Sequence, residues 1–154
     1  IIGLFAAALI LPGTVSAQDC DQLDPGVYPS LIEQDFRFGL YWLSHEEFEL
    51  AGRIFSDVID ADPEHAGAYA ARAMTALYLE DYEGAVADSE AALTLNPAYA
   101  SPYWVLGNVY YAQEDYQRAQ STFETYLDLA SDYVDPEVAA QLEVCQAKVQ
   151  ETEA

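Results

Sequence analysis

The pattern of apolar and polar residues predicts seven helices between Ser30 and the C-terminus. Ser30 and Glu33 form a capping box, in which each side chain satisfies a free backbone amide at the start of a helix. Pro63 and Pro97 each follow the end of a helix, because the residue before a proline disfavours helical backbone angles. We expect the helices at residues 30–44, 48–60, 66–79, 82–95, 100–113, 116–130 and 136–150.

The same pattern returns every 34 residues over three copies. A period of this length is typical of stacked helical units, none of which can bury its apolar face alone. We expect the recurring small residues to let the two helices of each unit cross closely, with aromatic residues filling the flanks. The small residues are Gly39, Ala73 and Gly107 in the first helices and Ala51, Ala85 and Ala119 in the second helices.

The seventh helix has the pattern of an end cap. Its apolar residues fall on one face, which predicts that this face seals the last unit while the other face meets water. The apolar face is Val138, Leu142, Cys145 and Val149, and the polar face is Gln141, Glu143, Gln146, Lys148 and Gln150. Residues 151–154 are expected to form a frayed tail.

The third copy carries a recognisable motif. It contains Leu106-Gly107, then Tyr110, then Ala119 and Phe123 in the second helix. This order resembles the tetratricopeptide repeat, with copies near 32–65, 66–99 and 100–133 and a cap at 136–150. The resemblance implies an all-α fold, a right-handed α-solenoid of three helix-turn-helix repeats with a seventh capping helix. It also implies a protein that binds other proteins and carries out no catalysis.

The resemblance further implies a binding groove along the first helix of each repeat. The groove positions are Phe36, Leu40 and Leu43, then Ala70, Met74 and Leu77, then Trp104, Asn108 and Tyr111. Each trio has i, i+4, i+7 spacing and shares one helical face. The leucines could equally pack against neighbouring helices, whereas Trp104 and Tyr111 are typical binding anchors.

Two details refine this expected groove. Asn108 is expected to hydrogen-bond the backbone of an extended peptide. Relatives that grip a C-terminal carboxylate use Lys and Arg in the row that Phe36, Ala70 and Trp104 occupy here, so a carboxylate clamp is not expected.

The second copy departs from the pattern at two positions. Arg72 stands where the other copies have Phe38 and Leu106, and Ser89 stands where they have an aromatic residue. A long polar side chain beside a shortened neighbour suggests compensation. We expect the Arg72 stem to lie between helices and its guanidinium group to reach solvent or an acid.

The N-terminal residues predict export. Ile1–Leu11 are apolar and uncharged, and Val15-Ser16-Ala17 has the small residues of a signal-peptidase site, so residues 1–17 are interpreted as a secretory signal. Residues 18–29 follow as an extended acidic leader, and the folded domain spans 30–150. The expected location is outside the cell or in the periplasm, and an uncleaved membrane anchor is the alternative.

Composition excludes several partners. The chain has 27 acidic residues against five basic ones, with a net charge of −22. Nucleic acid and anionic membranes both require a basic surface and are therefore not expected. The acidity is interpreted as a means of staying soluble, and attraction of a basic protein partner is the alternative.

No residue pattern supports catalysis, a metal or a cofactor. The two histidines, His45 and His65, fall in turns without a ligand partner at metal-binding spacing, and both are interpreted as surface residues. The sequence therefore predicts a monomeric interaction module that binds a peptide or protein in its groove. The alternative is a spacer or accessory subunit of a cell-envelope assembly, docked through its ends or convex face.

Overall fold

The computed structural model describes residues 30–130 and 135–153 of the chain, and all of these that are regular in structure are helical. The helices are α1 Leu31–Ser44, α2 Phe48–Ala61, α3 Ala66–Tyr78, α4 Tyr82–Leu95, α5 Ala100–Ala112, α6 Tyr116–Ala130 and α7 Pro136–Glu153. The predicted bounds of the first six agree to within one residue. None of the described helices is long and apolar enough to span a membrane.

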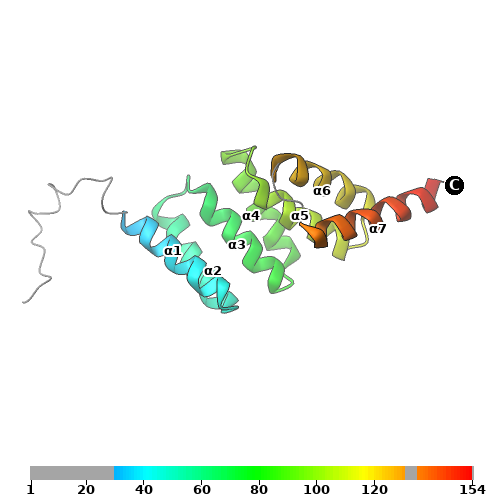
Figure 1. The fold of residues 1–154 in the computed structure, drawn as a ribbon. Helices are drawn as coiled ribbons and strands as arrows, with labels where there is room; N and C mark the ends of the chain where they lie inside the picture. The colour runs from blue at the N-terminus through cyan, green and yellow to red at the C-terminus, as the bar shows by residue number, and fades with distance from the viewer. Residues whose placement is uncertain (1–29, 131–134, 154) are drawn as a thin grey trace, which may run out of the picture. The chain divides into compact units, whose positions relative to one another are not determined.

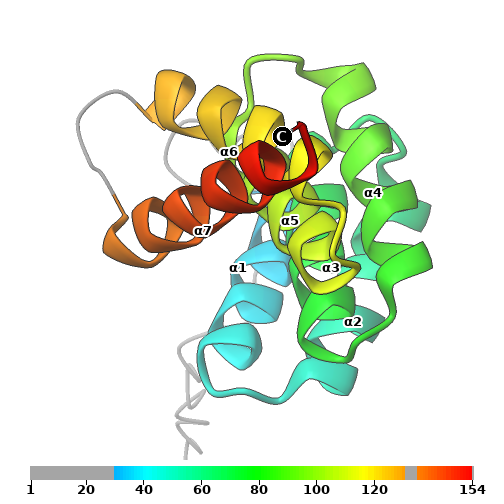
Figure 2. The ribbon, with the colours of Figure 1, turned by 90° about the vertical axis from the view of Figure 1, so that its right-hand side faces the viewer.

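The helices form three hairpins stacked side by side, followed by one more helix (Figures 1 and 2). Within the hairpins α1 packs on α2, α3 on α4 and α5 on α6, while α2 meets α3, α4 meets α5 and α6 meets α7. The first helices also meet one another, α1 with α3 and α3 with α5. The predicted all-α solenoid is thereby confirmed.

The turn inside each hairpin uses an acidic residue in the left-handed backbone region. Glu46, Glu80 and Glu114 have φ of 61°, 59° and 59°. The next residue then donates its backbone N–H back into the preceding helix, as Asp81 does to Ala76 O at 2.9 Å. A residue with left-handed backbone angles commonly ends a helix, because the backbone N–H groups that follow it can then bond the last free carbonyls of the helix. The acids that recur with the 34-residue period therefore lie in the turns between helices.

The helix crossings in the first and third hairpins pair a glycine with a phenylalanine. A Cβ atom on Gly39 would lie 2.5 Å from the Phe55 ring, and one on Gly107 would lie 2.5 Å from Phe123 Cδ1. Both rings are fully buried. Aromatic residues were expected at the flanks of the crossing, and in these two hairpins a ring also occupies the space that the missing Cβ leaves.

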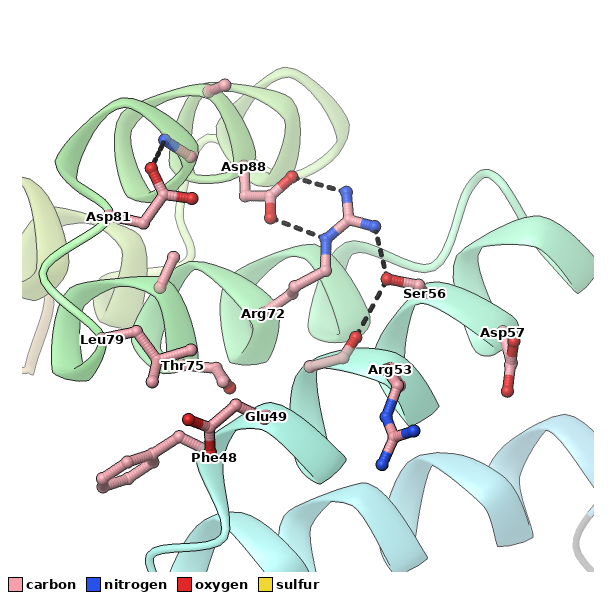
Figure 3. A pocket seen from close by; sticks show the side chains of 14 residues that line it. Phe48, Glu49, Arg53, Ser56, Asp57, Arg72, Thr75, Leu79, Asp81 and Asp88 are labelled. Atoms are coloured by element: carbon pink, nitrogen blue, oxygen red, sulfur yellow. Dashed lines mark hydrogen bonds and ion pairs between the residues drawn. The ribbon is translucent and has the colours of Figure 1, made fainter.

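The second hairpin has different residues at the same helix crossing. Ala73 and Ser89 take the places of glycine and phenylalanine, and both are fully buried. Arg72 extends over this region to the Asp88 carboxylate in α4 (Figure 3). The expected compensation between Arg72 and Ser89 is confirmed in part, since the guanidinium group meets an acid.

Helix α7 seals the end of the stack, with Val138 and Cys145 fully buried against α6 residues Ala119 and Phe123. The helix continues through Glu153, so the prediction of a frayed tail was wrong for residues 151–153. Lys148 Nζ lies 3.0 Å from Glu151 Oε2, which supports this last turn as an i, i+3 ion pair.

Candidate functional site

Three adjoining hollows form a groove along α1, α3 and α5. They have volumes of about 380, 460 and 310 Å³. Met74 lines the first two and Trp104 the last two, so the hollows join into one surface, called the groove below. Its further lining residues include Leu40, Leu43, Glu46 and Phe48 at the α1 end, Tyr99, Ser101, Tyr126 and Asp135 in the middle, and Leu77, Asn108, Tyr111, Glu137 and Gln141 at the α7 end.

Tyr78 lines all three hollows, although the sequence analysis did not name it. Its side chain is 50% exposed, and its ring stacks on Phe48 at a centroid distance of 4.8 Å. Tyr78 lies four residues after Met74, and i, i+4 residues share a helical face. That spacing was the sequence signal that could have identified Tyr78 as a groove residue.

Seven of the nine expected groove residues line the groove: Leu40, Leu43, Met74, Leu77, Trp104, Asn108 and Tyr111. The other two face inward. Ala70 is only 2% exposed, and the Phe36 ring packs against Phe55 and His65 with centroids at 5.9 and 4.6 Å. Phe36 and Ala70 therefore act in helix packing, because they lie on the flank of the face that meets the neighbouring helix.

Trp104 and Asn108 are held in place by their surroundings. Trp104 packs against two core clusters, one around Val105 and one around Phe123. Asn108 donates to Trp104 O at 2.8 Å and accepts from Gln141 Nε2 at 3.1 Å. Gln141 was expected on the solvent face of α7 but lies half-buried at the groove, so the Asn108 amide is already engaged by α7.

The charge in the groove is wholly negative. Its charged lining residues are Glu46, Asp135 and Glu137, and within the described part of the chain no Lys or Arg lines any of the three hollows. Three basic residues are bound elsewhere, Arg72 to Asp88, Arg118 to Asp115 and Lys148 to Glu151. Among the described residues, the groove therefore has no cationic side chain to form an ion pair with an anionic ligand.

A larger hollow of about 760 Å³ lies between α2, α3 and α4 (Figure 3). Its centre is a closed polar network. Arg72 donates to both Asp88 oxygens at 2.7 and 2.8 Å and to Ser56 Oγ at 3.0 Å, while Ser56 donates to Gly52 O at 2.9 Å. The guanidinium group thus supports the packing of α2, α3 and α4.

The histidines have different roles. His45 is exposed at the end of α1, as expected. His65 is half-buried, and its Nδ1 accepts from Ala68 N at 3.0 Å, which caps α3. His65 lies in the turn before α3, as expected, but it is not a surface residue. Across the described residues no group of three or more His, Cys, Asp or Glu side chains is arranged to hold a metal ion.

Comparison with known proteins identifies the repeats. Residues 76–143 match the tetratricopeptide repeat family model. The small glutamine-rich tetratricopeptide repeat-containing protein 2 of Saccharomyces cerevisiae is 29% identical over 110 residues, which are 71% of this chain and 32% of the relative. The protein SGT1 homolog of Oryza sativa subsp. japonica is 35% identical over 86 residues, covering 56% of this chain and 23% of the relative. The chain thus spans about a third or less of the curated relatives that it matches.

Solved structures share the fold. The Sgt2 tetratricopeptide repeat domain from Aspergillus fumigatus superposes with a TM-score of 0.71 at 19% identity, over 81% of this chain and 83% of that chain. The first such domain of Spaghetti (RPAP3), bound to the HSP90 peptide SRMEEVD, gives 0.70 at 20% identity, over 77% and 93%. The second domain of human RPAP3, in complex with the HSP70 peptide SGPTIEEVD, gives 0.63 at 24% identity, over 73% and 92%. Residues 76–143 thus match the tetratricopeptide repeat family, and helices α1 to α7 share the fold of tetratricopeptide repeat domains.

Proposed function

We propose that this chain is an exported, non-catalytic interaction module whose groove binds a segment of another protein. The observation that carries the proposal is the continuity of the groove, in which half-exposed Tyr78 lines all three hollows. Large, partly exposed aromatic side chains in a hollow are typical of binding hot spots. Two of the structural relatives were solved with peptides bound, which supports a peptide or protein as the ligand.

Cross-linking at neighbouring positions tests whether the groove is used. A photoreactive phenylalanine analogue at position 78 would face the groove, whereas one at position 79 would face the hollow between α2, α3 and α4, which Leu79 lines. Irradiation in the native host should give partner adducts from position 78 and not from position 79. Adducts from position 79 alone would reject the groove as the binding surface.

Substitution gives a second test of the same site once a partner is captured. Trp104→Ala should weaken partner binding by about 2 kcal/mol or more, the scale of a hot-spot residue. Because Trp104 also supports the core, Tyr78→Ala is the safer variant, since half of that side chain is exposed. Leu79→Ala, also partly exposed, is its matched control.

Export rests on the sequence of residues 1–17 alone. If the signal is cleaved, the N-terminal residue of the mature protein should be Gln18, which mass spectrometry of the extracellular or periplasmic fraction would detect. An intact N-terminal segment in the membrane fraction would instead favour the anchored alternative.

The second candidate function is a spacer or accessory subunit docked through its end. Phe38 and Tyr41 of α1 are 52% and 51% exposed, and both rings lie against Trp42, so they form an apolar patch that favours a contact at this end of the stack. A photoreactive residue at position 38 that captures a partner, with none captured at 78, would favour this alternative. Without a partner, we expect the purified protein to be monomeric.

A further inference from the structure

We infer that the groove takes a protein segment that is both apolar and cationic, opposite in charge to the acidic peptides bound by the structural relatives. This inference rests on the proposed use of the groove. The peptides SRMEEVD and SGPTIEEVD, which the two RPAP3-type domains bind, both end in acidic residues. The groove of this chain differs from a site for such peptides in three respects.

The first respect is the placement of acidic side chains. Glu46 lies at the α1 end of the groove, Asp135 in the middle and Glu137 at the α7 end. Among the salt bridges of the described residues, none uses any of these three carboxylates. Cationic side chains spaced along a bound segment would therefore meet a carboxylate in each hollow.

The second respect is an acceptor without a donor. Gln141 Nε2 donates to Asn108, while Gln141 Oε1 is enclosed and receives no hydrogen bond from the described residues. An enclosed oxygen without a donor is destabilising, and a turn of the Gln141 side chain toward the hollow would let a ligand donor reach it. A Lys or Arg side chain or a peptide N–H can supply that donor, and a carboxylate cannot.

The third respect is the aromatic lining. Tyr78 and Trp104 present aromatic rings beside the apolar Met74 side chain in the middle hollow. Aromatic faces attract Lys and Arg, whose methylene stems also pack on apolar surfaces. This chain already makes such a contact elsewhere, with Arg118 4.4 Å from the Tyr110 ring centroid.

An acidic segment would lack a cationic partner in this groove, although its peptide N–H groups could still bond Gln141 Oε1. Its carboxylates would lose water without gaining a cationic partner, in a chain with a net charge of −22. Apolar anchors alone could bind, but they would leave the Glu46 and Glu137 carboxylates without a cationic partner, and the Asp135 carboxylate with only the Glu137 backbone N–H that it already accepts. A segment with apolar residues flanked by Lys or Arg is therefore the occupant that the lining fits.

Peptide titration tests the inference directly. Three peptides of equal length would share the same leucine positions and differ only in carrying Lys, Gln or Glu between them. In a Trp42→Phe background Trp104 is the only tryptophan, so its fluorescence reports binding at the groove. At 0.1 M salt the Lys peptide should bind at least about tenfold more tightly than the Glu peptide. That ratio should shrink at 1 M salt, where the Debye length falls to about 3 Å.

Matched variants locate the effect. Glu137→Gln should weaken the Lys peptide about two- to fivefold and leave the Gln peptide unchanged. Glu143→Gln on the exposed face of α7 removes the same charge away from the groove and should change neither. Tyr78→Ala should weaken binding of the Lys peptide and the Gln peptide alike.

The contrary outcomes separate this inference from the proposed function. Equal binding of the three peptides, still lost in Tyr78→Ala, would overturn the cationic preference and leave the groove as a binding site. Tighter binding of the Glu peptide or of SRMEEVD would also overturn the cationic preference and leave the groove as a binding site. Binding of the Lys peptide that ignores Tyr78→Ala and Glu137→Gln would show attraction to the acidic surface at large and would also overturn the inference. Failure of all three peptides to bind would also overturn the inference of a cationic segment. Cross-linking at position 78 would then decide separately whether the groove binds a partner.

Discussion

Arg72 holds Asp88 through two parallel hydrogen bonds, from Nε to Oδ2 at 2.7 Å and from Nη2 to Oδ1 at 2.8 Å. The bonds join α3 to α4 inside the second repeat, beside the fully buried Ser89. The hydrogen bond to Asp88 is the main cause that raises the pKa of Arg72 above its ordinary value, against the opposing effect of burial. This two-point contact joins the helices of the second repeat, which has Ser89 where the other two repeats have a buried phenylalanine ring.

Removal of Asp88 should therefore destabilise the fold. Asp88→Ala would leave the partly buried Arg72 without its acid, at a cost of about 1–3 kcal/mol in the free energy of unfolding. Asp57→Ala removes an exposed acid from the same hollow and should cost less than about 0.5 kcal/mol. Urea unfolding of the two variants would test this. Equal stabilities would show that the pair contributes nothing to the fold.

The crossing in the second repeat should be convertible to that of the third. Ser89→Phe alone should destabilise the fold by about 1–3 kcal/mol, because its ring would meet the Ala73 Cβ. Adding Ala73→Gly and Arg72→Leu recreates the Leu106, Gly107 and Phe123 set and should recover most of that loss. A mutant cycle measured by urea unfolding would reveal the coupling. Strictly additive effects would contradict a shared crossing.

Two helical glycines should respond oppositely to alanine. Gly107→Ala should destabilise the fold by about 1–3 kcal/mol, since the new Cβ would lie 2.5 Å from Phe123 Cδ1 in a rigid core. Gly52→Ala should stabilise it by up to about 1 kcal/mol, because the nearest side-chain atom, Thr75 Cγ2, lies 3.4 Å away and alanine favours helices. Thermal and urea unfolding would compare them. A stabilising Gly107→Ala would disprove the tight crossing.

Asp115 should make stability depend on acid pH. The Arg118 backbone N–H at 3.0 Å and the Arg118 Nε at 2.7 Å lower the pKa of Asp115 below its ordinary value, the backbone bond being the larger cause. A carboxyl with a lowered folded pKa stabilises the fold above its unfolded pKa of about 3.9, and the effect is lost as pH falls through the folded value. In Asp115→Asn this acid-dependent part should disappear while the helix cap remains.

The NMR titration of Asp115 offers a sharper readout of the same contact. In Arg118→Ala the lowering of the Asp115 pKa should shrink but persist, because the backbone N–H of residue 118 still donates. An Asp115 pKa at the ordinary value in that variant would mean that the side-chain bond alone is responsible.

Cys145 should not react with alkylating reagents in the folded protein. Its side chain is fully buried against the α6 core, and burial raises the pKa of its thiol. Since the thiolate is the reactive form, iodoacetamide at pH 8 should modify Cys145 only after denaturation. Peptide mapping by mass spectrometry would follow this residue alone. Rapid modification of the native protein would show that α7 opens.

The sequence by itself determined the helices and their repeat. Capping residues, prolines and turn acids act within a few residues, so local pattern was enough to place six helices to within one residue. The family resemblance implied the groove positions, seven of which line the hollows, and spacing along a helix explains why the residues of one helix share a face. The length of α7 was underestimated, since the Lys148–Glu151 pair extends a helix that lacks a stop signal.

Only the tertiary structure decided which residues from different helices meet. The sequence predicted that Arg72 would reach solvent or an acid, but choosing Asp88 among 27 acids required the crossing of α3 and α4. The Asn108–Gln141 bond joins residues 33 apart, and Phe36 turns inward because His65 and Phe55 lie beside it. A repeat pattern in the sequence specifies which residues share a face of each helix. The distances between faces follow from how the helices pack, and that packing joins three hollows into one groove at Tyr78.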